Sequence, residues 1–199
     1  MPGRTPHDAV RAFLEPLQSA LACIANGVIS ARGGLSPKVR APQQWSLNDG
    51  GGVELLTEHP EGLTLYASMY WEVIEDDREG YGPFRVTTRG YDYSLVRGEA
   101  TELWAIHWHP SGNSWERLPH VHLGDVLFAD GAPVSSKSHL RTGRMTFENA
   151  VRWCIEFGGV PLHDDWDERL ALAEAPHLLH RTWSANPDIS TPPTPGVFT

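Results

Sequence analysis

Four histidines alternate with apolar residues along two stretches of this chain, WAIHWHP and LPHVHLG. If each stretch is a β-strand, successive side chains point to opposite faces, so His107 and His109 share the polar face of the first strand. His120 and His122 share the polar face of the second strand for the same reason. A hairpin centred on residues 114 and 115 then places His107 opposite His122, and His109 opposite His120. Opposed Cβ atoms lie about 4.5 to 5.5 Å apart, so the sequence predicts a cluster of four imidazoles.

The face of these histidines is predicted more firmly than their pairing. A slip of two residues between the strands keeps the same faces and changes only the partners. A slip of one residue buries the imidazoles and exposes the indoles of Trp104 and Trp108, which core formation opposes.

Clustered imidazoles are expected to stay neutral at pH 7, because like charges disfavour one another. Neutral rings serve general acid–base catalysis or metal ligation. In the first case the catalytic residues are His107, His109, His120 and His122. In the second, the same four rings bind Zn²⁺ or another divalent metal, with Asp125, Glu116 and His139 as further candidate ligands. A purely structural role also stays open, since an aromatic-rich antiparallel strand tolerates histidine on its solvent face.

A basic segment, SKSHLRTGR, follows the histidine strands in an otherwise acidic chain. Lys137, His139, Arg141 and Arg144 are candidates for binding phosphate or another part of a substrate, just before the start of a predicted helix. Arg85, on an earlier strand, is expected to extend this cationic surface. The alternative is that the charges of this short run are simply solvated.

The elements that position these residues indicate an α+β fold. Helical spacing of apolar residues predicts a first helix after Thr5, with Pro16 kinking it or delaying its start. Residues 30–52 are predicted to form a long loop without a regular element. Strands are expected at residues 63–73, at 84–95 with a bend at Gly90, at 101–109 and at 119–128. Helices follow Thr146 and residues 164–165, with a final turn from residue 176.

These elements predict a curved antiparallel meander sheet of about four or five strands, flanked by N-terminal and C-terminal helices. We expect one domain over residues 1–185, because 199 residues with 40% hydrophobic content and eight tryptophans suffice for one core. Residues 186–199 are rich in proline and threonine and are predicted to be a disordered tail.

The composition restricts the function classes. A formal charge of −9 opposes long-range attraction to nucleic acid, so RNA binding requires a local basic patch. Two cysteines do not form a disulfide framework, and neither a signal peptide nor a spanning segment is evident, so we expect a cytoplasmic protein without membrane contact. The phosphate-binding, dinucleotide, zinc-protease and nucleophile-elbow motifs are absent.

Residues 83–158 resemble the TumE-like toxins of bacterial toxin–antitoxin modules. The resemblance is carried by the strand LWAIHWHP, the loop SGNSWERL, the motif PHVHLG and the helix from Phe147. It implies a small toxin that a cognate antitoxin or another protein partner neutralises and that acts on RNA. The segment PHVHLGDVLFADG also resembles a cupin motif, but its acid, Asp125, comes too early and no later histidine strand follows.

The leading hypothesis from the sequence is a histidine-dependent nuclease or phosphodiesterase that needs no metal. In it, His120 and His122 act as acid and base, while Lys137, Arg141 or Arg144 stabilises the charge on phosphorus. The second hypothesis is a metal-binding hydrolase or oxygenase on the same four rings. The third is a non-catalytic interaction protein.

Overall fold

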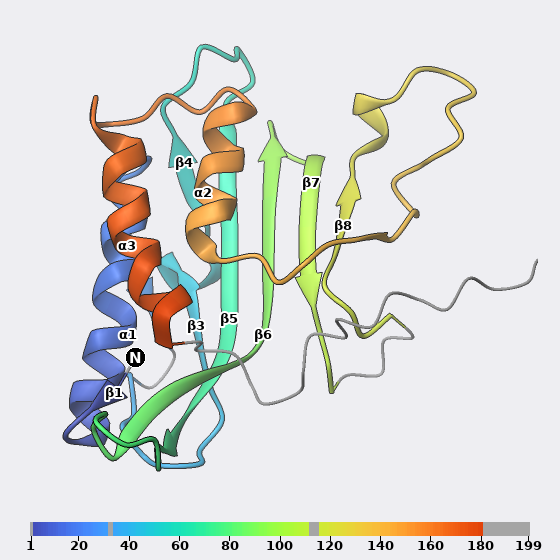
Figure 1. Ribbon diagram of the computed structural model, residues 1–199. Coiled ribbons are helices and arrows are strands. Elements are labelled where there is room, and N and C mark those ends of the chain that lie inside the picture. The colour runs from blue at the N-terminus through green and yellow to red at the C-terminus, as the bar shows by residue number, and fades with distance from the viewer. Residues whose placement is uncertain (1, 32–33, 112–115, 181–199) are drawn as a thin grey trace, which may run out of the picture.

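The computed structural model describes residues 2–31, 34–111 and 116–180 (Figure 1). Within these ranges the chain forms three α-helices and one sheet of nine strands. The helices are α1 (Pro6–Leu21), α2 (Phe147–Glu156) and α3 (Trp166–His180). The strands are β1 (Pro2–Gly3), β2 (Ile29–Ser30), β3 (Gln43–Leu47), β4 (Val53–Leu55), β5 (Leu63–Glu75), β6 (Phe84–Arg97), β7 (Thr101–Trp108), β8 (His120–Leu123) and β9 (Leu140–Arg141).

All strand pairs of the sheet are antiparallel, in the order β2-β3-β5-β6-β7-β8-β9, with β1 paired to β6 and β4 paired to β5. The predicted α+β class and antiparallel sheet are therefore confirmed. The expected number of four or five strands is wrong: β1, β2 and β9 have only two residues and are too short to show alternation, and β3 and β4 were not predicted either. The prediction of no regular element over residues 30–52 is also wrong, since β3 lies there.

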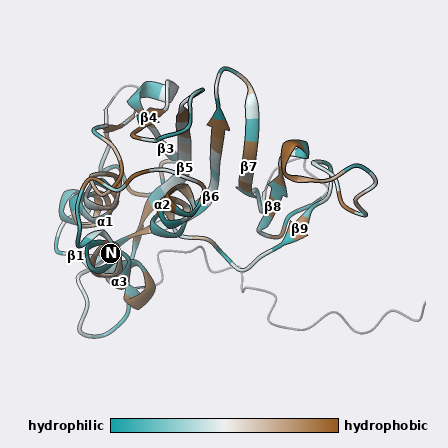
Figure 2. Ribbon diagram, turned by 90° about the horizontal axis from the view of Figure 1, so that it is seen from above, coloured by the Kyte–Doolittle hydropathy of each residue, from teal (hydrophilic) through white to brown (hydrophobic). Residues whose placement is uncertain are grey.

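Alternation along the long strands sets which face of the sheet is the core. On β5, Leu63, Leu65, Met69 and Trp71 are buried, and the residues between them are more exposed. Figure 2 shows the three helices gathered on one side of the sheet. Phe147 of α2 contacts the rings of core-facing residues on β3 and β6. In the part of the chain that the structure describes, no helix covers the opposite face of β5, β6 and β7, on which Ser68, Asp92 and His107 lie.

Local sequence signals account for the element boundaries. Thr5 caps α1 in a capping box with Asp8, and Thr146 caps α2 by accepting a hydrogen bond from the backbone N–H of Asn149. The first helix starts directly after Thr5 and runs through Pro16, so no late start is needed. The third helix likewise continues through Pro176 to His180.

The predicted bend near Gly90 is present as a bulge. Tyr70 pairs with Gly90 and Trp71 pairs with Thr88, which leaves Arg89 as the extra residue on β6. The same strand ends at Arg97, two residues later than predicted, and β7 begins at the predicted residue, Thr101.

No helix within the described ranges is long and apolar enough to cross a membrane. Cys23 and Cys154 are both buried free thiols. The predicted tail at residues 186–199 lies outside the described residues.

Candidate functional site

A single row of polar residues crosses the uncovered face of the sheet. Starting on β3, Ser46 pairs with Ser68, and Ser68 pairs with Asp92. The row continues as His107 opposite Asp92, and then His120 opposite His107. It ends with Arg141 on β9. Antiparallel pairing alone therefore brings a carboxylate and two imidazoles from three neighbouring strands together.

The predicted pairing of the histidine strands is wrong by two residues, although the predicted face is correct. His107 lies opposite His120, and Ala105 lies opposite His122. His109 falls just beyond the end of β7. A two-residue slip leaves every side chain on the same face because the period of a strand is two. Trp104, Ile106 and Trp108 are accordingly buried on the helix side.

Five histidine rings form one contiguous cluster. The ring centroid of His107 lies 5.7 Å from that of His109, 5.6 Å from that of His120 and 5.4 Å from that of His122. The rings of His120 and His122 are 5.1 Å apart. His139, from the segment before β9, lies 4.7 Å from His120 and 4.4 Å from His122.

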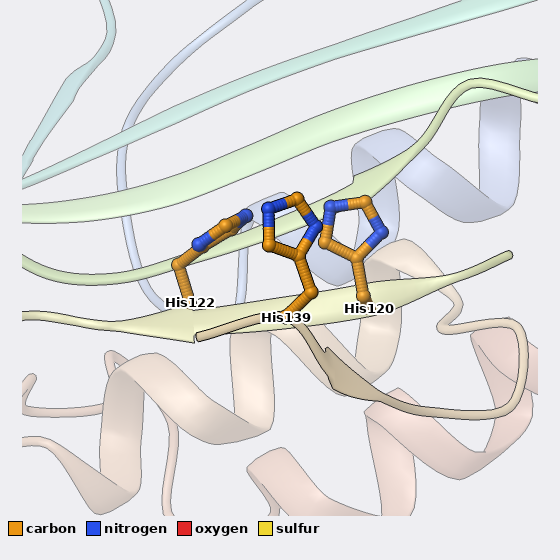
Figure 3. A group of neighbouring side chains, drawn as sticks. All are labelled: His120, His122 and His139. Carbon is orange, nitrogen blue, oxygen red and sulfur yellow. The ribbon is translucent and has the colours of Figure 1, made fainter. Parts of the chain in front are cut away.

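His120, His122 and His139 form the trihistidine group (Figure 3). Each ring offers one nitrogen, and these three nitrogens lie within 4.8 Å of one another. In Figure 3 the ring of His139 lies between the other two rings, which project from the same face of β8. Three converging nitrogens match the number of protein ligands in a catalytic zinc site.

Backbone carbonyls fix two of these rings. His120 Nδ1 lies 2.8 Å from the carbonyl oxygen of Leu118, and His122 Nδ1 lies 3.0 Å from the carbonyl oxygen of Ser136. A carbonyl only accepts hydrogen bonds, so each Nδ1 carries the proton and donates it. The lone pair of each neutral ring is then on Nε2. Ligating histidines generally make such a bond through their other nitrogen.

The carbonyl that orients His122 is itself held in place. Asp125 Oδ1 accepts a hydrogen bond of 2.8 Å from the backbone N–H of Ser136, and Oδ2 accepts one of 2.7 Å from the Ser136 hydroxyl. Asp125 begins the short 3₁₀ helix Asp125–Leu127 directly after β8. The predicted ligand Asp125 thus supports a histidine through Ser136.

Asp92, His107 and His109 form a second set, the Asp92 group. Asp92 Oδ1 lies 2.7 Å from His107 Nδ1 and 2.8 Å from His109 Nε2. Burial raises the pKa of Asp92, but the hydrogen bonds from the two histidines outweigh this and bring it down to about 2. The carboxylate is therefore ionised at neutral pH.

The two sets of histidines have opposite proton affinities. The hydrogen bond to Asp92 raises the pKa of His109 above its ordinary value. Burial lowers the pKa of His120 and of His122, and the neighbouring imidazoles lower both further. His120 and His122 are therefore neutral at pH 7, as expected for clustered rings, whereas the raised pKa of His109 goes against that expectation.

Of the predicted phosphate-binding residues, His139 joins the histidine cluster, whereas the side chains of Arg141 and Arg144 have other partners. Arg141 Nε donates a hydrogen bond of 3.0 Å to Glu116 Oε2. A predicted phosphate-binding arginine and a predicted metal ligand therefore form an ion pair with each other. Arg144 lies over the ring of Trp108, 4.3 Å from its centroid, and the side chain of Lys137 is exposed.

Arg85 lies far from the cluster along the same strand as Asp92. Its Nε is 3.7 Å from Asp76 Oδ1, and its backbone pairs with Pro2 and Ile74. Seven residues separate it from Asp92, which corresponds to roughly 20 Å along a strand. It therefore does not extend a cationic surface beside the histidines.

A polar pocket of about 700 Å³ lies on the uncovered sheet face and reaches the Asp92 group. Its lining includes Ser46, Ser68, Asp92, Ser94 and His107. Tyr66, which is 39% exposed, forms part of its wall. The pocket therefore gives access to Asp92 and His107.

One residue of the site, Asp92, was missed in the sequence analysis, and the position of another, His139, was not predicted. Asp92 was not considered, although it alternates with the core-facing Tyr91 and Tyr93 and therefore must lie on the polar face. His139 was predicted to bind phosphate or to serve as a further ligand, but its direction was not predictable. It joins the cluster because residues 124–139 return to the edge of β8 through the pairing of β8 with β9.

Comparisons with protein-family models, with curated proteins and with solved structures found no match to this chain. The resemblance to the TumE-like toxins therefore stays a prediction, and the function is argued from the site alone.

Proposed function

We propose that this protein is a metal-dependent hydrolase whose trihistidine group binds one divalent transition-metal ion, with zinc the best match. The observation that carries the proposal is the convergence of three imidazole nitrogens within 4.8 Å on one face of the sheet. Imidazole ligands suit Zn²⁺, and three protein ligands leave a fourth position for water or substrate.

The protonation state of the group supports the same proposal. A ligating nitrogen must carry a lone pair, and metal binding competes with protons for it. The lowered pKa values of His120 and His122 reduce that competition at neutral pH. Their Nδ1 protons are already engaged by backbone carbonyls, so binding through Nε2 requires no change of tautomer.

The surroundings of the group favour hydrolysis. A bound zinc ion supplies a water molecule of lowered pKa, which is a nucleophile at neutral pH. His107 lies between the trihistidine group and Asp92 and lines the polar pocket. A substrate in the pocket therefore approaches the group along Asp92 and His107, while Ser68 and Ser94 offer hydroxyl groups to its polar atoms.

Elemental analysis tests the proposal. Protein without an affinity tag, purified after growth with added zinc, is expected to hold at least one equivalent of metal. His122→Ala and His139→Ala are each expected to lower metal content strongly. His163→Ala is the matched control, because His163 is exposed and outside the cluster. A metal content below a tenth of an equivalent in the unaltered protein contradicts the proposal.

Activity provides the second half of this test. A panel of ester, amide and phosphodiester substrates is assayed before and after chelation, and hydrolysis is expected to stop with chelation and to return with zinc. Activity that survives complete metal removal overturns the metal-dependent mechanism.

A metal-independent phosphodiesterase is the second candidate, and one observation favours it. The pKa of His109 is raised while those of His120 and His122 are lowered, and such a separation provides an acid and a base in one site. For this candidate, the family resemblance implies that the protein is a toxin that cleaves RNA. It also implies that a cognate partner neutralises the toxin. The candidate predicts chelator-resistant cleavage of RNA that is lost in both His109→Asn and His122→Asn.

A further inference from the structure

The Asp92 group has the donors of a second cation site beside the trihistidine group. Asp92 Oδ1, His107 Nδ1 and His109 Nε2 are its contacting atoms, and one ligand atom from each residue lies within 4.8 Å of the other two. The three residues come from β6, β7 and the position directly after β7, so neighbouring strands fix their relative positions.

The donor set differs from that of the trihistidine group in charge. Imidazole ligands bring no negative charge to a divalent cation, whereas the Asp92 group includes a carboxylate. Mixed nitrogen and carboxylate ligands suit zinc, manganese and iron. The carboxylate is also partly withdrawn from solvent, with its side chain 35% exposed, which strengthens its attraction for a cation.

His107 connects the two groups in space. Its ring contacts His109 within the Asp92 group, and it contacts both His120 and His122 in the trihistidine group. The two sets of donors are therefore adjacent. In two-metal hydrolases, cations about 3.5 to 4 Å apart act as a clamp on the attacking and leaving oxygens of a substrate.

We infer that the Asp92 group binds a second divalent transition-metal ion, so that the hydrolase centre is dinuclear. The inference rests on the proposed function, because it adds a second cation to the trihistidine site. His107 and His109 ligate through nitrogens without protons. The protons that these nitrogens share with Asp92 therefore move to the other ring nitrogens or to solvent when the cation binds. The pocket opens onto Asp92 and His107, so the second cation contacts the substrate first.

Metal stoichiometry tests the inference on the full chain without a tag. Metal-stripped protein is titrated with Co²⁺ or Zn²⁺, and bound metal is counted by elemental analysis after removal of the excess. The unaltered protein is expected to bind two equivalents. Asp92→Asn and His109→Ala are each expected to bind one, with the visible Co²⁺ spectrum of the trihistidine group retained.

Two controls separate ligand loss from misfolding. Glu102→Gln removes an exposed carboxylate of β7 that also lines the pocket, and it is expected to keep two equivalents. The melting temperature of each metal-free variant identifies any that fails to fold. His109 lies beyond the end of β7 and is partly exposed, so His109→Ala is expected to fold even if Asp92→Asn does not.

Each outcome of the titration has one meaning. One equivalent in the unaltered protein overturns the dinuclear centre and leaves the proposed function in place. Two equivalents that persist in both Asp92→Asn and His109→Ala also overturn it, because the second cation then binds elsewhere. Less than a tenth of an equivalent overturns the proposed function together with the inference.

Discussion

His107 faces His120 directly across the β7–β8 pair, and the centroids of their rings are 5.6 Å apart. This contact joins the Asp92 group to the trihistidine group, since His107 lies on β7 and His120 on β8. The distance between the two groups is therefore set by the backbone pairing of two short strands. A change that separates these strands is expected to disrupt the site without touching any histidine.

Gly124 provides such a change, because it packs against the backbone of β7 directly after β8. A Cβ atom at this position lies only 1.8 Å from the carbonyl oxygen of Glu102, so Gly124→Ala forces the strands apart. We expect a loss of about 1 to 3 kcal/mol in the free energy of unfolding, as for other overpacked sites. Urea denaturation measures this loss, and metal titration measures the accompanying fall in affinity.

The matched control for this prediction is Gly143→Ala. A Cβ atom at Gly143 meets nothing within 4 Å, and its backbone is not in the left-handed region. The variant is expected to keep both stability and metal affinity. Equal behaviour of the two variants refutes the claim that close strand approach holds the cluster together.

Asp125→Ala tests whether His122 is positioned through Ser136. Without the carboxylate, Ser136 loses two hydrogen bonds, one from its backbone N–H and one from its hydroxyl, and its carbonyl no longer holds His122 Nδ1 in a fixed place. Loss of such an outer partner typically lowers metal affinity by about 10- to 100-fold. Asp125 is exposed, so the melting temperature of the metal-free protein is expected to change little.

Competition with a chromophoric chelator measures the affinity of Asp125→Ala. Asp130→Ala, at another exposed acid of the same segment, is its control. An affinity for Asp125→Ala within a factor of two of the control value rules out this positioning role.

The sequence predicts the face of the histidines better than their register, and the reason lies in the loop between them. Alternation of Trp104, Ile106 and Trp108 with His107 depends only on burial, which the core imposes on every other residue. The pairing depends instead on the geometry of the turn. A symmetric hairpin about residues 114 and 115 gives the wrong partners, because the observed pairs are centred one residue earlier.

The position of His139 could not be predicted from local sequence patterns. It comes from a segment without alternation or helical spacing, and only the pairing of β8 with β9 brings it to His120 and His122. Asp92, by contrast, lies on a predicted strand between two buried tyrosines, so its face was predictable from the sequence. The register that places Asp92 opposite His107 was not predicted.

Stability of the metal-free protein is expected to fall as pH decreases from about 7.5 to 5.5. Burial lowers the pKa of His120 and His122 in the folded state, so below about 6.5 the unfolded chain binds protons that the folded chain does not. This loss begins near the unfolded pKa and ends below the folded one. His109 acts in the opposite sense, because its raised pKa gives stability below about 6.5 that is lost as pH rises.

Urea denaturation at several pH values, with a chelator present, measures this dependence. His122→Asn is expected to make the free energy of unfolding less dependent on pH over this range. His109→Asn is expected to make the dependence steeper, since the opposing contribution is removed. A flatter profile for His109→Asn contradicts the assignment of the two opposing shifts.

Glu148 and His177 form a buried pair between α2 and α3, away from the histidine cluster. His177 Nδ1 lies 2.9 Å from Glu148 Oε1, and the two side chains are 4% and 0% exposed. His177 Nε2 also lies 3.2 Å from the carbonyl oxygen of Phe13 on α1. This imidazole therefore joins all three helices that cover the sheet.

His177→Leu leaves the Glu148 carboxylate buried without this partner and is expected to cost about 3 to 5 kcal/mol in unfolding free energy. The double variant Glu148→Leu/His177→Leu is expected to lose less, because both polar groups are removed together. Urea denaturation of the single and double variants measures the difference in their free energies of unfolding. The folded fraction of each variant is expected to keep its metal content. If the double variant is less stable than His177→Leu alone, Glu148 stabilises the fold independently of His177. The interaction between the two side chains is then not what stabilises the packing of the helices.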